Sequence, residues 1–305
     1  MAHRIHTLVA ASLVIAAAAG CRPRLDEVSV PPRAEPAATQ GVQACWVESR
    51  ARFGFTASSL LVRHPEGDLL IDAGNSTHFD DEIEAYEGST KRWLATFPGA
   101  LKPKRSLAEE LRAVHVDPAG LRWVLPTHAH LDHLGGVVDL PPTPVLLDDA
   151  EAAVVEHGRE EVTFEVIPAH ARAVEGHVEP LELKPEPYEI FERHADLFGD
   201  GSVVVVPLPG HTPGSVGVFV RLLDGRRVFH VGDAVNDRKQ ITHLRGRTAA
   251  MRRTDSDRDA AEHTVARLHG LAEQSDVLFL PAHERAAWEA VFGRPGAPCE
   301  RAPTD

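Results

Sequence analysis

One short segment of this 305-residue chain concentrates side chains that can bind a metal ion. Three imidazoles and one carboxylate stand within six positions, directly after an apolar stretch, at His128, His130, Asp132 and His133. Imidazole nitrogens and carboxylate oxygens both suit a borderline-soft cation such as Zn2+, at roughly 2.0 to 2.2 Å. Alternate residues of an extended segment point the same way, so His128 and His130 can converge on one ion. Asp132 and His133 can bind a second ion from the following turn, and the pattern therefore predicts a metal centre.

Three further candidate ligands follow apolar stretches in the same way. His211 lies in a turn rich in proline and glycine, Pro207-Leu208-Pro209-Gly210-His211-Thr212-Pro213-Gly214, which fixes the direction of a side chain. Asp233 follows Val231-Gly232, and His283 follows Leu280-Pro281-Ala282. Alone, Asp233 would more often be a turn former and His283 a surface residue. Their assignment as ligands therefore depends on the whole set.

The elements that must position these ligands can be predicted from the spacing of apolar residues. Alternating or wholly apolar stretches predict strands at 45–50, 58–63, 69–72, 121–125, 145–147, 203–207, 215–221, 227–231 and 277–280. Helical spacing predicts helices at 149–157 and 255–271, with Ser256 as a candidate cap, and a helix that begins at the capping box of Ser106 and Glu109. Residues 80–103 are predicted to form a loop with short helical pieces, and residues 161–200 an irregular insertion. Interspersed strands and helices indicate sheets in the middle and helices outside.

The start of the chain has the features of an export signal. Arg4 precedes an apolar run that is too short to span a bilayer, and residues 1–20 are predicted to be a signal peptide. The junction Ala18-Ala19-Gly20-Cys21 resembles a bacterial lipobox, which implies cleavage before Cys21 and a lipid on its sulfur. Ordinary cleavage after an alanine is the alternative. We therefore expect an exported protein on the periplasmic side of a bacterial membrane, with a lipid anchor in the outer membrane as the favoured form.

The chain after the predicted signal peptide divides into three parts. Residues 21–43 are rich in proline, alanine and charge, which predicts a flexible tether. Residues 44–293 are expected to form one catalytic domain, and residues 294–305 a loose tail. Cys45 and Cys299 stand near the two ends of this body, and in an exported protein they either form a disulfide or remain unpaired thiols.

Composition limits the partners. With 45 acidic against 32 basic residues the formal net charge is −13, which disfavours nucleic acid. Histidine is the commonest metal ligand, and the 18 histidines agree with metal chemistry, although most of them must be surface or packing residues. We expect a small-molecule substrate, and contact with a membrane only through the lipid anchor.

With these motifs in this order, the chain resembles the metallo-β-lactamase superfamily. That family's pattern is H-x-H-x-D-H, then a histidine, a bridging aspartate and a final histidine, and the resemblance covers roughly residues 44–293. It implies an α/β (α+β) fold, a four-layer αββα sandwich with the site at one edge of two packed sheets. It also implies two Zn2+ ions per chain, with Fe or Mn as alternatives. The first would be bound by His128, His130 and His211 and the second by Asp132, His133 and His283, with Asp233 between them.

The resemblance also implies a reaction. Two zinc ions would lower the pKa of a shared water to about neutral, and the bridging hydroxide would attack a carbonyl group. Asp132 would move a proton as well as bind metal, so Asp132 and Asp233 are the candidate catalytic residues. Asp72 resembles the family's carboxylate beside the site, and a turn residue at a strand end is the alternative.

The bridging Asp233 favours the branch of lactonases and glyoxalase II-like thioesterases. Residues 196–202 and 61–67 also resemble lactonases, so an acyl-homoserine-lactonase-like enzyme is the leading prediction. Lactonases place a tyrosine three residues after the bridging aspartate, whereas this chain has Asn236, which can donate a hydrogen bond to the substrate. The alternatives are a periplasmic β-lactamase and, in another class, an iron-dependent persulfide dioxygenase.

Overall fold

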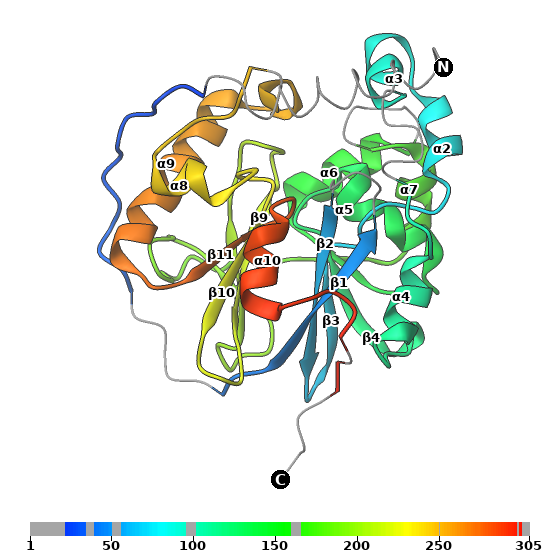
Figure 1. The fold of residues 1–305 in the computed structure, drawn as a ribbon, viewed down its shortest axis with the longest axis horizontal. Helices are drawn as coiled ribbons and strands as arrows, with labels where there is room; N and C mark the ends of the chain where they lie inside the picture. The colour runs from blue at the N-terminus through cyan, green and yellow to red at the C-terminus, as the bar shows by residue number, and fades with distance from the viewer. Residues whose placement is uncertain are drawn as a thin grey trace, which may run out of the picture.

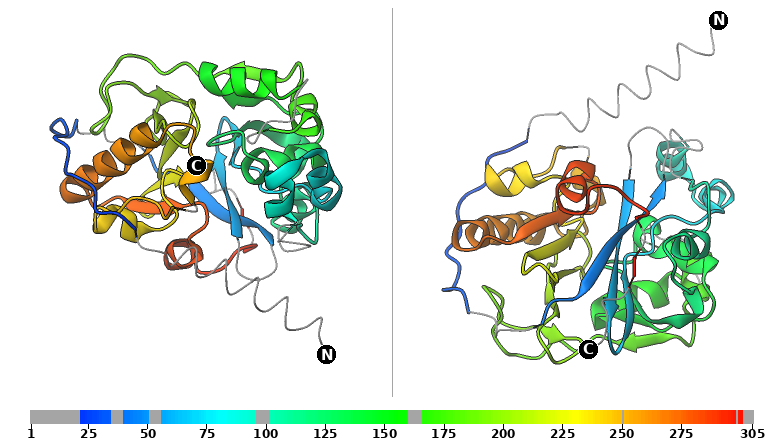
Figure 2. Two further views of the ribbon diagram at one scale, coloured as in Figure 1. Left: turned by 90° about the horizontal axis from the view of Figure 1, so that it is seen from above. Right: turned by 60° about the horizontal axis from the view of Figure 1, so that its bottom comes forward.

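The computed structural model describes residues 22–34, 40–50, 56–95, 102–159, 166–249, 251–297 and 299–300. Two sheets pack face to face, and helices cover the outer face of each sheet (Figures 1 and 2). This four-layer arrangement confirms the predicted fold class. The predicted signal peptide at 1–20 and the lipid-attachment residue Cys21 lie outside the described residues. No helix in the described part of the chain is long and apolar enough to cross a membrane.

The first sheet has six strands in sequence order. They are β1 (Gln43–Arg50), β2 (Thr56–His64), β3 (Gly67–Ile71), β4 (Leu121–Leu125), β5 (Val145–Leu147) and β6 (Val178–Pro180). The first three pair antiparallel, and from β3 onward the pairing is parallel. The helices on its outer side are α4 (Leu107–Ala113), α5 (Leu131–Leu134), α6 (Asp149–His157) and α7 (Pro168–Ala173).

The second sheet has five strands in the order β11-β10-β9-β8-β7. They are β7 (Ala195–Asp196), β8 (Val203–Pro207), β9 (Val216–Arg221), β10 (Arg227–Gly232) and β11 (Leu278–Pro281). Only the β10–β11 pair among them is parallel. The outer face is covered by α8 (Arg238–Thr242) and α9 (Arg258–Gln274), while α10 (Arg285–Phe292) inserts Trp288 into the core between the sheets. The other short elements are α2 (Phe79–Glu82), η2 (Ile83–Ala85), α3 (Gly88–Leu94), η3 (Pro118–Gly120), η4 (Gly135–Asp139) and η5 (Met251–Thr254).

Alternation along the strands produces the layers. In β8, Val203 and Val205 belong to the core between the sheets, whereas Val204 and Val206 pack against the helices on the other side. Successive side chains of a strand point to opposite faces, and a strand covered on both faces must be apolar at every position. The run of four valines therefore specifies a central strand that leads directly to His211.

The predicted strands are all present, with ends that differ by one or two residues. The capping box of Ser106 and Glu109 is formed as predicted. The predicted cap of α9 is wrong, because Asp257 rather than Ser256 accepts the hydrogen bond from the Ala260 N–H. The Ser256 hydroxyl instead donates to the His211 carbonyl at 3.1 Å, so this serine supports a candidate ligand. The segment predicted to be irregular contains α7, β6 and β7 in its described part.

The N-terminal strap, residues 22–34, differs from the flexible tether that the sequence predicts. Leu25 is buried in the core under α8 and α9, and its N–H donates to the Leu244 carbonyl at 3.0 Å. Arg22 forms an ion pair of 2.7 Å with Asp237, and the Ala34 N–H donates to the Glu189 carbonyl at 2.8 Å. Proline and charge in this segment predict a free chain, but Leu25, Val28 and Val30 join the apolar cluster beneath α8 and α9, and Val30 lies against Gly270 of α9. Figure 1 shows the strap running beside α9.

The C-terminal segment also differs from the loose tail predicted for 294–305. Cys299 is fully buried and forms a disulfide with Cys45, with the two Cα atoms 5.8 Å apart. The Cys299 carbonyl accepts a hydrogen bond of 2.6 Å from Arg63. The described part of the tail is therefore fixed to β1 and β2, while residues 298 and 301–305 lie outside the described residues.

The packing of the strap predicts a stability effect. Leu25→Ala should lower the free energy of unfolding by about 2 kcal/mol, since it removes a buried side chain and leaves a partly filled space. The exposed Glu27 provides a matched control, and Glu27→Ala should change stability by less than about 0.5 kcal/mol. Urea denaturation of both variants measures the difference. Equal midpoints for Leu25→Ala and the parent would mean that the segment is free in solution.

Candidate metal centre

The structure brings all seven predicted ligands to one edge of the two sheets. His128 and His130 follow β4, and α5 carries Asp132 and His133 immediately afterwards. From the second sheet, His211 follows β8, Asp233 follows β10 and His283 follows β11. Ligands from four strand ends in two sheets therefore meet where the sheets pack together.

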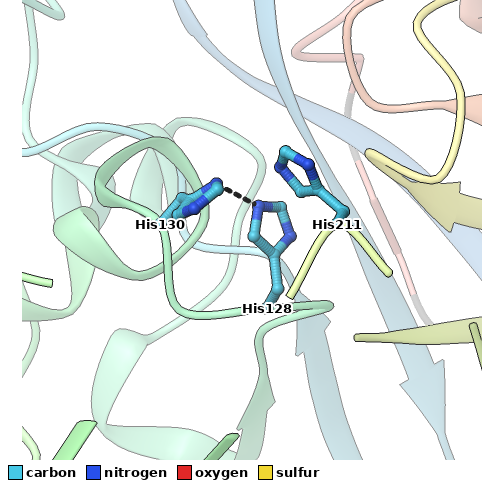
Figure 3. A group of neighbouring side chains, drawn as sticks. All are labelled: His128, His130 and His211. Carbon is cyan, nitrogen blue, oxygen red and sulfur yellow. Dashed lines mark hydrogen bonds between the residues drawn. The ribbon is translucent and has the colours of Figure 1, made fainter. Parts of the chain in front are cut away.

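A three-histidine subsite is formed by His128, His130 and His211. All three rings are buried, and one nitrogen of each lies within 4.8 Å of the others. His128 Nε2 and His130 Nδ1 are 2.9 Å apart. Figure 3 shows the three rings facing one another, two from the loop after β4 and one from the loop after β8. Such a group can converge on one cation.

A second subsite is formed by Asp132, His133 and His283, whose ligand atoms also lie within 4.8 Å of one another. Asp233 stands between the two subsites. Its Oδ1 is 3.1 Å from His283 Nε2 and 3.5 Å from His133 Nε2, and its Oδ2 is 3.6 Å from His211 Nε2. One carboxylate thus contacts ligands of both subsites, which is the position expected of a bridging residue.

The donor atoms fit a pair of divalent cations. His133 Nε2 and His211 Nε2 are buried, and neither forms a hydrogen bond with any described residue. Buried polar atoms are normally hydrogen-bonded, because leaving one without a partner costs free energy. A set of nitrogen and carboxylate oxygen donors aimed at the same space suits a borderline cation such as Zn2+.

Burial and charge keep the three-histidine subsite ready for a cation. Burial, followed by the neighbouring His133, His130 and His211, holds the pKa of His128 well below its usual range. Burial, followed by Arg247 and His130, does the same to the pKa of His211. Both imidazoles are therefore neutral near neutral pH, and a neutral imidazole has the lone pair that binds a metal.

The second subsite is charged when no metal is bound. Burial alone would lower the pKa of His283, but Asp233 and Asp132 raise it to about 9. Burial likewise opposes protonation of His133, yet Asp72, Asp132 and Asp233 raise its pKa well above the usual range. Against its own burial, Asp233 has a pKa held well below the usual range by His283 and His133. Protons on these histidines occupy the place that a cation would take.

Asp72 supports His133 from behind. It is 1% exposed, and its backbone adopts a φ of 61°, a value uncommon for a residue other than glycine. Asp72 Oδ1 accepts a hydrogen bond of 2.6 Å from the Thr127 N–H, and Oδ2 lies 2.9 Å from His133 Nδ1 and 2.8 Å from His230 Nε2. A carboxylate at the far nitrogen of a ligand fixes the ring and leaves Nε2 for the metal.

Asp255 plays the same part for His211 and was missed from the sequence. Its Oδ1 lies 3.0 Å from His211 Nδ1, and Arg247 Nε lies 3.3 Å from the same oxygen. Both side chains are almost fully buried. The sequence predicts Asp255 as the first residue of a helix, and no local pattern indicates its partner, 44 positions away.

Other residues singled out in the sequence lie beside the site or away from it. Asn236 is on the loop between β10 and α8, where its N–H donates to Gln240 at 2.7 Å, and its contact with a substrate stays a prediction. The two segments that resemble lactonases meet each other, because His64 contacts Asp200 at 3.1 Å. They lie at the ends of β2 and β8 remote from the ligands, so they do not contribute to the ligand set.

Comparisons with known proteins agree on the family to which this chain belongs. Residues 52–270 match the family model described as the metallo-beta-lactamase superfamily. The chain is 24% identical over 243 residues to the N-acyl homoserine lactonase AttM of Azorhizobium caulinodans, a match that covers 77% of this chain and 84% of that protein. It is 30% identical over 183 residues to a probable metallo-hydrolase of Mycobacterium tuberculosis, over 57% of this chain and 55% of that protein.

Solved structures agree on the fold. An N-acyl homoserine lactone hydrolase with the product N-hexanoyl-L-homoserine bound aligns with a TM-score of 0.56 at 16% identity, over 80% of this chain and 93% of that chain. The dizinc quorum-quenching lactonase AidC aligns with a TM-score of 0.52 at 15% identity, over 81% and 89% of the two chains. At these identities the likeness concerns the fold.

The proton on His283 predicts that metal binding depends on pH. Since its pKa is about 9 in the metal-free protein, Zn2+ must displace a proton to use this nitrogen. Zinc affinity of the second subsite should rise with pH, and the proton on His283 contributes about tenfold per unit up to about pH 9, in addition to the contribution of the proton on His133. The sign for stability is opposite, because the ion pair of protonated His283 with Asp233 stabilises the metal-free fold and is lost as pH rises through about 9.

Competition with a chromophoric chelator across this pH range measures the affinity, and calorimetry measures the protons released. His283→Ala should remove the contribution of His283, so that fewer protons are released on zinc binding, while the contribution of His133 remains. A second zinc affinity that does not change with pH would contradict the assignment.

Proposed function

Since this chain belongs to the metallo-β-lactamase superfamily, as the match over residues 52–270 shows, we propose that it is a zinc-dependent hydrolase that cleaves the ester bond of a lactone. The observation that carries the proposal is the position of Asp233, which contacts ligands of both subsites and suits a dinuclear centre. The substrate class is supported by the relatives, because AttM proteins at 24–25% identity are N-acyl homoserine lactonases.

Two zinc ions would be held by the seven residues already described. When bound, they supply Lewis acidity, which activates a water molecule and polarises the carbonyl group of the substrate. The buried histidines exclude bulk water from the inner side of the site, where charge interactions are strong. Asp72 and Asp255 hold their histidine partners in one orientation, so little reorganisation accompanies the reaction.

Asp132 is the residue placed to move a proton. Its side chain is 20% exposed, against 9% for Asp233, so it is the carboxylate of the site that reaches solvent. Asp132 Oδ2 lies 3.4 Å from His283 Nε2, which keeps one oxygen directed into the site. A carboxylate between a buried centre and solvent can accept a proton from the attacking water and deliver it to the leaving alkoxide.

Asn236 is the proposed contact to the substrate. It follows Asp233 by three positions, on the loop that begins at the end of β10. Its backbone is fixed by the hydrogen bond to Gln240, and its amide group can donate a hydrogen bond to a carbonyl oxygen. This residue type differs from the tyrosine that the resemblance leads one to expect, so substrate preference is where this chain should depart from its relatives.

We also propose that the protein is exported and attached by a lipid on Cys21 to the periplasmic side of a bacterial membrane, the outer membrane being favoured. The support is the short apolar run that ends in Ala18-Ala19-Gly20-Cys21. Arg22 is already fixed to the body through Asp237, so a lipid one residue earlier would hold the catalytic domain close to the bilayer surface.

Hydrolysis by purified protein tests the activity, with zinc and iron quantified in the same sample. The panel contains N-acyl homoserine lactones of several chain lengths, an aryl ester, a glutathione thioester and nitrocefin. We expect lactone turnover with two zinc ions per chain. Asp233→Asn should reduce it by at least about 100-fold, since even the loss of a ligand's hydrogen-bond partner costs about 10–100-fold.

Asp224→Asn, at an exposed carboxylate in the turn after β9, is the matched control and should leave turnover unchanged. Turnover of nitrocefin alone would replace the lactonase proposal with a β-lactamase. Iron in place of zinc, with no hydrolysis of any substrate, would contradict the hydrolase itself.

Lipid attachment is tested by expressing the full chain in a bacterial host. The parent should fractionate with membranes and incorporate a labelled fatty acid, whereas Cys21→Ser should be exported without label and recovered in the soluble fraction. Equal fractionation of the two forms, with no label in either, would show that the signal is cleaved in the ordinary way.

A further inference from the structure

Glu151 is a buried carboxylate with no role in the ligand set. It lies in the first turn of α6, and only 1% of its surface is exposed. Glutamate is rarely buried this deeply unless its oxygens are satisfied by partners. It shares the inward face of the helix with Val155, so it occupies a position where the helix would otherwise present an apolar side chain to the core.

Its two oxygens contact both segments that supply the three-histidine subsite. Oε1 accepts a hydrogen bond of 2.6 Å from the N–H of Ala129, the residue between His128 and His130. Oε2 accepts from the Thr212 hydroxyl at 2.7 Å and from the Gly214 N–H at 3.1 Å. Thr212 follows His211 directly. One side chain therefore connects the loop after β4 in the first sheet with the turn after β8 in the second.

We propose that Glu151 is a positioning residue that sets the spacing of His128, His130 and His211 and thereby the zinc affinity of that subsite. The inference depends on the proposed metal centre but not on the identity of the substrate. Three ligands that come from two sheets need a fixed separation. The Val216 N–H donates to the Thr127 carbonyl at 2.9 Å and joins the two segments at their base, whereas Glu151 contacts the residue between His128 and His130 and the residue after His211.

The chemistry of the contacts requires a carboxylate. All three partners are donors, two backbone N–H groups and one hydroxyl, and an ionised carboxylate offers acceptors on both oxygens. Glutamine has one acceptor oxygen, and its NH2 group would face a donor whichever way the amide turned. Glu151→Gln therefore keeps the volume and breaks one side of the bridge.

The packing around Glu151 agrees with a close approach of the two loops. A Cβ on Gly214 would overlap the backbone of Glu151, so only glycine lets the His211 turn come this near to α6. Thr212 is held further by Ser215, whose Oγ lies 2.7 Å from the threonine hydroxyl. The turn therefore reaches Glu151 as a rigid unit.

The test measures zinc binding in the three-histidine subsite alone. His283→Ala removes a ligand of the second subsite, and in this background the affinity of the remaining subsite is measured by competition with a chromophoric chelator. Adding Glu151→Gln should weaken zinc binding by about 10–100-fold, the usual effect of losing a group that orients ligands. Adding Thr212→Val, which removes one of the three contacts, should weaken it by a smaller factor.

Glu156→Gln is the matched control, because Glu156 lies on the same helix and is exposed, and its carboxylate pairs with Arg159 at the surface. It should leave zinc affinity unchanged. The melting temperature of each metal-free variant is measured together with its zinc affinity. If Glu151 had only a structural role, its replacement would lower the melting temperature and leave the zinc affinity of the folded protein within about twofold of its parent. That result, in Glu151→Gln or in the milder Thr212→Val, would overturn the proposal.

These outcomes are separate from the proposed activity. Zinc affinity is measured without substrate, so a protein that binds zinc and hydrolyses no lactone would remove the lactonase proposal and leave the role of Glu151 intact. A parent protein that binds no zinc would remove both.

Discussion

Mutual compensation of buried charge is the constraint on which this structure depends. Asp72, Asp233 and Asp255 are all buried at one edge of the sandwich, where an isolated carboxylate would be strongly destabilising. Asp72 and Asp233 are tolerated because protonated imidazoles lie beside them, and Asp255 because Arg247 Nε lies 3.3 Å from its Oδ1. Asp72 and Asp255 in turn hold the imidazoles of His133 and His211. The result is a cluster in which nitrogen and oxygen ligand atoms converge on the same space. Among the described residues, several of these buried atoms, such as His133 Nε2 and His211 Nε2, have no hydrogen-bond partner. A pair of cations completes the compensation that the side chains begin.

This arrangement requires both sheets. The first sheet supplies His128, His130 and the residues of α5, whereas the second supplies His211, Asp233 and His283. The distance between the two groups is set by the apolar core between the sheets, and it is refined by side chains that cross from one to the other. Asp72 does so through His230, which lies on β10, and Glu151 does so through Thr212. The packing of the sandwich therefore determines the geometry of the site.

The ligands could be predicted from the sequence because their types are rare and their positions are local. His128 to His133 lie within one short segment, and each later ligand ends an apolar strand that is itself visible in the sequence. The strands could be predicted from apolar runs such as the four valines of β8, whereas the four layers were implied by the resemblance to the family. What could not be predicted depends on contacts between distant residues. Glu151 meets Ala129 22 positions away, and Leu25 is buried by residues more than 200 positions later, so no local pattern marks them.

The two segments that resemble lactonases, residues 61–67 and 196–202, do not belong to the metal centre. They lie together, joined by His64 and Asp200, on the side of the sandwich remote from the ligands. Evidence about the substrate therefore has to come from residues at the site, such as Asn236.

Anomalous diffraction at the zinc absorption edge, on crystals grown with zinc, would locate the metal ions in the site. We expect two peaks, one among His128, His130 and His211 and one among Asp132, His133 and His283, with Asp233 between them. A single peak, or zinc bound elsewhere with these side chains left in contact with one another, would contradict this assignment.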